Sequence, residues 1–214
     1  MEVLELKPIK NKKIFVIIIK KNNNQLTQDE SVFIKNIIEK YNVNFATITL
    51  KPTEVESFKE TNLAMLLNDL LTPFFLVDIP SYAMGYLESE IAEKKEKISE
   101  LEKEYRSLED KTSFKAENLK SWIEYLKEEL QKNQQYVNTK LKAQWIVKKI
   151  LDIVRFYEDS LYYEDILYII HFTPEELVLD LKQTLEELGI FVIICEIKKN
   201  YLNTKYASTK LGVN

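Results

Sequence analysis

The chain has 214 residues, a net charge of -4 at neutral pH, and a single cysteine, Cys195. This length favours one principal domain, the acidic balance argues against sequence-independent binding of nucleic acid, and a single cysteine excludes an intramolecular disulfide. The chain also has only three glycines, which excludes the glycine-rich loops that bind phosphates. We expect a cytoplasmic protein, and no apolar stretch is long enough to predict a membrane span.

The first part of the chain alternates apolar runs with amphipathic segments. Residues 13–20 are an unbroken, largely β-branched run, and shorter apolar runs follow at 43–50 and 74–79. Thr27 and Thr53 each stand three residues before a glutamate, which is the spacing of a capping box at the start of a helix. The pattern predicts three strands separated by two helices.

From residue 81 to residue 157 the apolar spacing changes to steps of three and four residues. Such heptad spacing is typical of a coiled-coil seam and predicts a long antiparallel helical hairpin. The polar stretch 109–113 interrupts the seam and is the expected turn. Residues 145–157 are apolar around most of the helix circumference, so we expect them to pack on the domain while the distal part projects into solvent.

Two further strands are predicted beyond the hairpin, at 166–172 and 190–197. Between them, Thr173 and Pro174 are predicted as the N-cap and first residue of a helix. That helix is expected to end at Gly189, in the position where a left-handed conformation closes a helix.

Strands separated by helices of this length build parallel sheets. We therefore predict an α/β fold with a five-stranded, mainly parallel, Rossmann-like or flavodoxin-like sheet and helices on both faces. Residues 1–80 and 158–214 are its two parts, the second ending in a C-terminal tail. Residues 81–157 are the hairpin inserted between the third and fourth strands.

Ligands of open α/β sheets bind beyond the carboxyl ends of the strands. The side chains predicted to gather there, and to form a ligand site if one exists, are Lys20, Asp78, Ser81, His171 and Thr173. Two of them also have a structural interpretation: Asp78 can cap the following helix, and His171 can be a buried, hydrogen-bonded residue. No catalytic residue, cofactor or metal site is predicted, and the sequence leaves open whether the protein is an enzyme.

An alternative hypothesis is a metal-dependent nuclease that uses Glu196 and Lys198. The two residues form a Glu-x-Lys tripeptide after an apolar run, which resembles the metal-binding tripeptide of restriction-type nucleases. Such a site also needs an acidic residue on an adjoining strand, and Asp78 can supply it only if the third and fifth strands are neighbours.

The leading hypothesis is a non-enzymatic interaction or scaffold protein, in which the hairpin binds a protein partner or a second copy of the chain. Nucleic acid is a less favoured partner, and no membrane is expected. A second hypothesis is a sensor domain that binds a nucleotide or another anion at the strand ends and moves the hairpin. The predicted partner-binding residues are the seam residues Ile98, Leu101, Tyr105, Leu119, Ile123 and Leu126.

Overall fold

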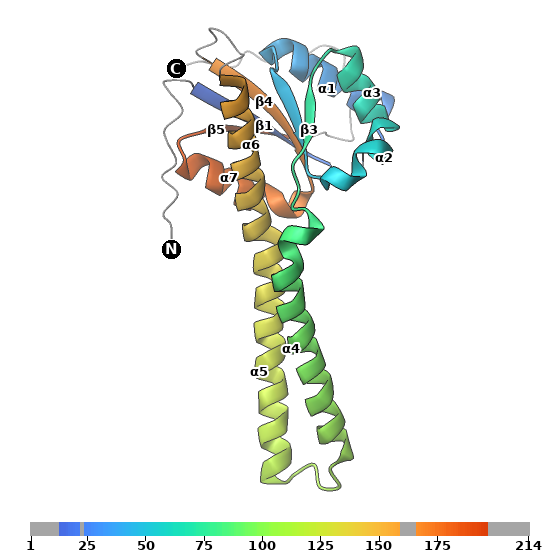
Figure 1. Ribbon diagram of the computed structural model, residues 1–214, viewed down its shortest axis with the longest axis vertical. Helices are drawn as coiled ribbons and strands as arrows, with labels where there is room; N and C mark the ends of the chain where they lie inside the picture. The colour runs from blue at the N-terminus through green and yellow to red at the C-terminus, as the bar shows by residue number, and fades with distance from the viewer. Residues whose placement is uncertain (1–12, 22–23, 159–165, 197–214) are drawn as a thin grey trace, which may run out of the picture.

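Five apolar runs form one sheet in the computed structural model, which describes residues 13–21, 24–158 and 166–196. The strands are β1 (Lys13–Lys20), β2 (Phe45–Ile48), β3 (Phe74–Leu76), β4 (Ile166–Thr173) and β5 (Phe191–Cys195). Every pairing between them is parallel, and their order is β3-β2-β4-β1-β5 (Figure 1). The predicted α/β fold with a parallel sheet is confirmed. The order differs from the 3-2-1-4-5 order of Rossmann sheets and the 2-1-3-4-5 order of flavodoxin-like sheets.

Helices cover both faces of this sheet, which explains the unbroken apolar run of β1. Ile17 and Ile19 pack with α1 (Gln28–Tyr41), α2 (Val55–Lys59) and α3 (Asn62–Asp69) on one face. Val16 and Ile18 pack on the other face. The helices of that second face are α6 (Lys142–Glu158) and α7 (Val178–Glu187). All four β1 side chains are fully buried.

The first predicted capping box is confirmed at the start of α1. Thr27 Oγ1 accepts a hydrogen bond from the Glu30 amide at 3.3 Å, and the Glu30 carboxylate accepts one from the Thr27 amide at 2.8 Å. The second predicted box is wrong, because a 3₁₀ helix, η1 (Pro52–Glu54), already begins after Lys51. Proline suits a first helical position, and Thr61 then caps α3 as a separate helix.

The predicted N-cap role of Thr173 is also wrong. Thr173 is the last residue of β4, is fully buried, and accepts a hydrogen bond at 3.0 Å from the hydroxyl of Thr49, which directly follows β2. Its hydroxyl is therefore used within the sheet, and the 3₁₀ helix η3 (Glu175–Leu177) begins without a side-chain cap. The left-handed conformation predicted for Gly189 is confirmed by its φ of 75°.

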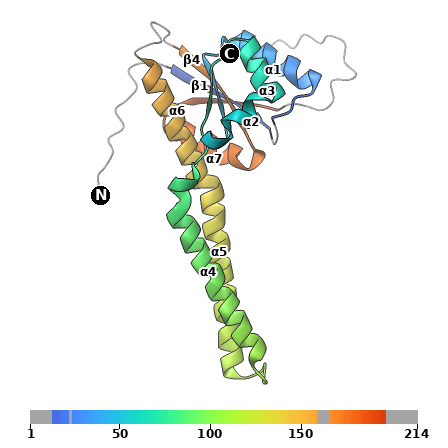
Figure 2. The same cartoon turned by 45° about the vertical axis from the view of Figure 1, so that its right-hand side comes forward.

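Two long helices, α4 (Ser81–Ser107) and α5 (Phe114–Tyr136), lie side by side and extend away from the sheet (Figures 1 and 2). We call α4, α5 and the connecting residues 108–113 the arm. Ser113 caps α5 by accepting a hydrogen bond from the Ala116 amide at 3.2 Å. At about 1.5 Å per residue, the 27 residues of α4 span about 40 Å.

The arm is rooted at the carboxyl ends of the strands. The chain passes from β3 directly into α4, and α5 continues through a π-helical turn, η2 (Val137–Leu141), into α6 (Figure 1). This π turn contacts η3, which follows the end of β4. The edge of the sheet that was predicted to carry a ligand site is thus the edge from which the arm extends.

Candidate functional site

At the carboxyl edge, His171 is fully buried between Thr47 of the neighbouring strand β2 and Thr49, which directly follows that strand. Thr47 Oγ1 is 2.8 Å from His171 Nδ1, and Thr49 Oγ1 is 3.2 Å from His171 Nε2. Burial lowers the pKa of His171 to about 3, so the ring is neutral at physiological pH. A neutral imidazole has one donor and one acceptor nitrogen, and the two threonine hydroxyls can satisfy both.

Lys20, at the end of β1, is held by two carboxylates. Its Nζ lies 2.7 Å from Glu196 and 3.3 Å from Glu175. The pKa of Lys20 is raised, most strongly by the hydrogen bond to Glu196 and further by the hydrogen bond to Glu175. Desolvation of the ammonium group opposes this rise and is outweighed. The ammonium group is already neutralised by these carboxylates, so a bound anion would have to displace them.

Lys21 forms a more buried pair than Lys20. Its Nζ lies 3.3 Å from Glu30 of α1, and its side chain is only 5% exposed. Desolvation opposes ionisation of Glu30, but hydrogen bonds from the Thr27 amide and from Lys21 outweigh it and lower the pKa of Glu30. This pair joins the end of β1 to the start of α1.

Asp78 links the two segments that connect the arm to the sheet. It directly precedes the start of α4, and its Oδ2 lies 2.9 Å from Nζ of Lys142, the first residue of α6. Its other oxygen accepts a hydrogen bond from the Ile79 amide at 2.7 Å. Ser81, the first residue of α4, accepts a hydrogen bond at 3.2 Å from Lys51 Nζ.

The five predicted ligand residues thus lie at one edge but in separate pairs. β1 and β3 are separated by β4 and β2, which corresponds to about 14 Å between the strands of Lys20 and Asp78. His171 and Thr173 lie on β4 between them, and their polar atoms are bonded to Thr47 of β2 and to Thr49, which directly follows β2. In this arrangement the five side chains bind other protein groups, and they stabilise the edge at which the arm begins.

The predicted partner-binding residues lie in the seam of the arm. Ile98, Ile123 and Leu126 are buried together, Leu101 and Tyr105 pack against them, and Leu119 is half-buried. Because these side chains hold α4 to α5, they are covered while the arm is intact.

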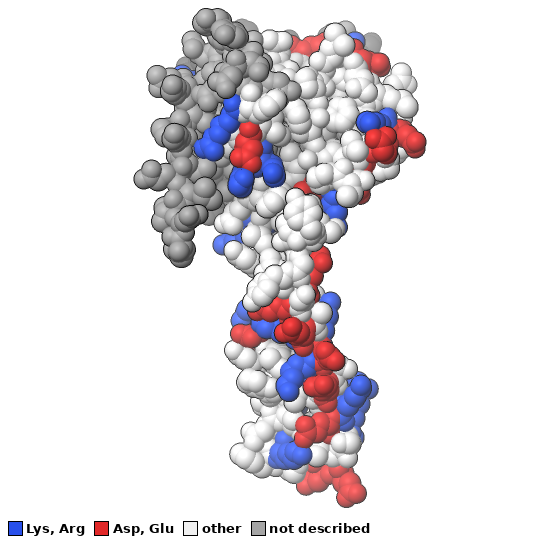
Figure 3. Space-filling view, viewed as in Figure 1, with Lys and Arg blue, Asp and Glu red and all other residues white. Residues whose placement is uncertain are grey.

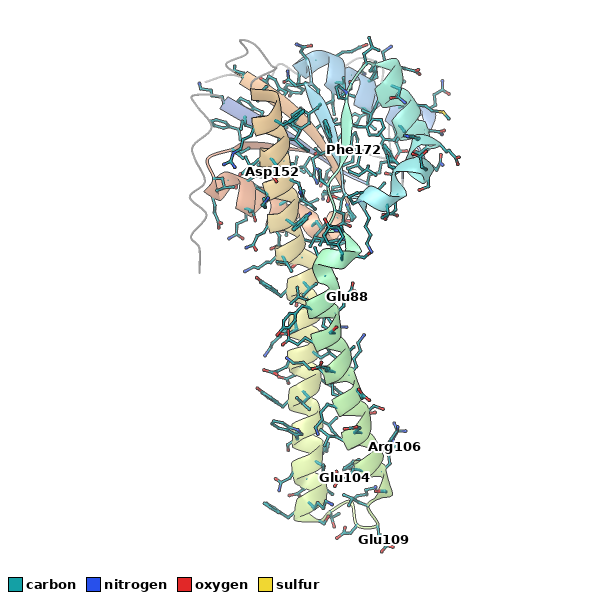
Figure 4. All side chains as sticks on the ribbon, in the orientation of Figure 1. Glu88, Glu104, Arg106, Glu109, Asp152 and Phe172 are labelled. Atoms are coloured by element: carbon teal, nitrogen blue, oxygen red, sulfur yellow. The ribbon has the colours of Figure 1, made fainter. Side chains whose placement is uncertain are left out.

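Ion pairs flank this seam, and the charged side chains of the arm are seen in Figures 3 and 4, where Glu104 and Arg106 lie near the tip. Lys127 Nζ is 2.6 Å from Glu102, Lys115 Nζ is 2.8 Å from Glu104, and Lys94 Nζ is 3.5 Å from Glu129. These residue pairs run in opposite directions along the two helices, which establishes that α4 and α5 are antiparallel.

The arm also carries large aromatic side chains that point away from the seam. The exposed aromatic residues of the arm are Tyr82 and Tyr86 on α4, and Phe114, Trp122, Tyr125 and Tyr136 on α5. Trp122 and Tyr125 stack on each other, with ring centroids 5.4 Å apart. The heptad pattern that predicts the seam does not include these residues. The signal that could have found them is the presence of aromatic side chains at helix positions outside the heptad seam.

The residues of the nuclease hypothesis are not brought together. Asp78 follows β3 and Glu196 follows β5, and these strands are the two opposite edges of the sheet. Lys198 lies outside the described residues. Within the described ranges no three His, Cys, Asp or Glu side chains are grouped for metal binding. Burial raises the pKa of the Cys195 thiol, which disfavours the nucleophilic thiolate.

Comparison of the chain with protein-family models, curated proteins and solved structures finds no match. Among the helices in the described part of the chain, none combines the length and apolar character needed to cross a bilayer.

Proposed function

We propose that the protein is a non-enzymatic interaction or scaffold protein. The sheet together with the helices that cover it, which we call the body, holds the arm, and the arm binds a protein partner. The observation that carries this proposal is the exposed aromatic surface of the arm. Trp122 and Tyr125 are each about half exposed, and Tyr86 is 80% exposed. Exposed Trp and Tyr side chains are the residues most enriched at energetically important positions of protein interfaces.

The construction of the arm supports the same function. Its seam is narrow, Ile98, Ile123 and Leu126 form a buried cluster in it, and ion pairs flank it. The arm is therefore held together by its own contacts and leaves the aromatic side chains free to contact another molecule. At its root, the Asp78–Lys142 pair and the π turn connect it to the body.

The two alternative hypotheses have less support. A nuclease needs acidic groups on adjoining strands, whereas Asp78 and Glu196 follow opposite edges. A nucleotide or anion sensor needs cations at the strand ends, whereas Lys20 and Lys142 are each paired with carboxylates.

Site-specific photo-crosslinking in the native cell tests the proposal. A photoreactive amino acid is placed at Trp122 or Tyr86 on the arm, and at Met65 on α3 as a body control that is also about half exposed. We expect protein adducts from the arm positions and few from Met65. The double variant Ile98→Glu with Leu126→Glu, which separates α4 from α5, is expected to abolish the arm adducts. Equal labelling from arm and body positions, or adducts unaffected by opening the seam, would refute the proposal.

A further inference from the structure

The exposed aromatic side chains of α5 are arranged symmetrically along the helix. Phe114 and Tyr136 are the first and last residues of α5, and each is 11 residues from Tyr125. Eleven residues are about three helical turns, so the three side chains project from nearly the same side. Trp122, stacked on Tyr125, widens this line at its centre. We call Phe114, Trp122, Tyr125 and Tyr136 the α5 stripe.

The α5 stripe lies on a side of the helix that α4 does not cover. Ile123 and Leu126 of α5 are buried against α4, whereas Phe114 is 79% exposed and the other three stripe residues are each about half exposed. Figure 3 shows a largely uncharged surface over the α5 side of the outer arm, while acidic and basic side chains gather over α4. The stripe is therefore a line of exposed aromatic side chains that a second molecule can contact, distinct from the seam inside the arm.

From this arrangement we infer that the partner of the α5 stripe is a second copy of the chain, packed antiparallel about a two-fold axis at Tyr125. This inference rests on the proposed function and names its partner. A two-fold interface brings the same patch of both subunits together, so it requires a self-complementary surface. Antiparallel pairing about Tyr125 places Phe114 against Tyr136 of the other copy, and Tyr125 against its own counterpart.

The charges of α5 allow this pairing along its whole length. Across the axis, Asn118 is opposite Lys132 and Trp122 is opposite Glu128. None of the residue pairs related in this way along 114–136 brings together two groups of the same charge. Like charges directly opposed would cost free energy and would select against this register. The sequence of α5 thus tolerates this two-fold register without electrostatic repulsion between opposed residues.

The size of the interface and the shape of the molecule are also compatible with a dimer. With about 150–250 Å² for each aromatic side chain, the exposed parts of the stripe add up to about 400 Å² per copy, or about 800 Å² for the pair. Flanking polar residues bring this near the lower limit of about 1,200 Å² for a specific interface. In each chain the arm extends away from the sheet and its covering helices (Figure 1). Antiparallel pairing of two arms therefore places the two bodies at opposite ends.

Sedimentation of the full chain over a range of concentrations tests the inference first. We expect a reversible dimer with a Kd in the micromolar range, on the order of 1–100 μM, as suits an interface of this size. Tyr125→Glu places two carboxylates directly opposite each other and is expected to weaken the dimer at least about tenfold. Gln131→Glu is the matched control, because it adds the same charge about 120° around the helix from Tyr125. It should leave the Kd unchanged.

Disulfide crosslinking then tests the register in a Cys195→Ser background. Tyr125→Cys should crosslink to itself on oxidation. Phe114→Cys and Tyr136→Cys should each fail to crosslink alone but form a disulfide when the two variants are mixed. A chain that is monomeric throughout this concentration range, or a Phe114→Cys variant that crosslinks to itself, would overturn the inference. Arm adducts with a different protein from a monomeric chain would overturn it while leaving the proposed function intact.

Discussion

Replacing the only histidine, His171, should change how strongly the stability of the protein depends on pH. In the folded protein its pKa is about 3, whereas an exposed histidine in the unfolded chain has a pKa of about 6.5. Because the folded pKa is lowered, the stabilisation is present above about pH 6.5 and is lost as the pH falls from there toward 3. Protonation in acid then favours the unfolded chain.

The magnitude follows from the difference between the two pKa values. A difference of one pH unit between them corresponds to about 1.4 kcal/mol, so the full loss approaches about 5 kcal/mol below pH 3. Between about pH 7 and pH 4.5 the expected loss from His171 alone is about 2.5 kcal/mol. A His171→Gln variant lacks this titration. This variant should be less stable than the wild type at pH 7. The difference between the two proteins in free energy of unfolding should be about 2.5 kcal/mol smaller at pH 4.5 than at pH 7.

Urea unfolding of both proteins at the two pH values measures this change, and the comparison cancels the contributions of all other titrating groups. Thr47→Val is the control, because it removes the hydroxyl 2.8 Å from His171 Nδ1 but keeps the histidine. It should lower stability while retaining the pH dependence of the wild type. Proton NMR gives a direct check, since a chain with one histidine has one imidazole titration to follow. Two results would refute the buried environment of His171. One is a difference in free energy of unfolding between variant and wild type that stays constant with pH, and the other is a titration midpoint of the folded protein's imidazole near pH 6.5.

Three further changes test other parts of the structure by urea unfolding. Deleting Asn138 from the π turn should convert this turn to a regular helix and lower the free energy of unfolding by about 1 kcal/mol or less. Deleting Gln131 from α5 should lower it by several kcal/mol, because this deletion rotates the preceding seam residues by about 100°. Equal losses would contradict the π turn. Lys21→Met should cost about 2 kcal/mol by leaving the part-buried Glu30 carboxylate unpaired, and a loss below about 0.5 kcal/mol would show that the pair is solvated. Trp145→Phe should lower the free energy of unfolding by less than about 1 kcal/mol. The reason is that the indole N–H is buried without a hydrogen-bond partner in the part of the chain that the structure describes. A larger loss would indicate that this N–H has a partner.

Local signals in the sequence were sufficient for the elements that depend on neighbouring residues. The run at 13–20 predicted an interior strand because both faces of β1 are covered, and a strand buried on both sides needs no polar residues. Thr27 predicted the start of α1 because its capping partner is only three residues away. The polar stretch at 109–113 likewise separates α4 from α5.

The π turn had a sequence signal of its own, although the heptad prediction did not use it. Asn133, Val137, Leu141 and Trp145 follow one another in successive steps of four residues. A regular helix would move such side chains gradually around its surface, whereas a π turn takes up the extra residue. The widened spacing coincides with η2 (Val137–Leu141), where the arm meets the body.

Other features were decided only by the tertiary structure, because they depend on contacts between residues far apart in the chain. Thr173 had the sequence of a good N-cap, but its hydroxyl accepts a hydrogen bond from Thr49, which directly follows the adjacent strand β2. The pairing of Asp78 with Lys142 required the end of β3 and the start of α6 to meet after the arm had folded back on itself. The strand order has the same origin, since parallel strands pair through long crossovers and no local pattern identifies a strand's neighbours.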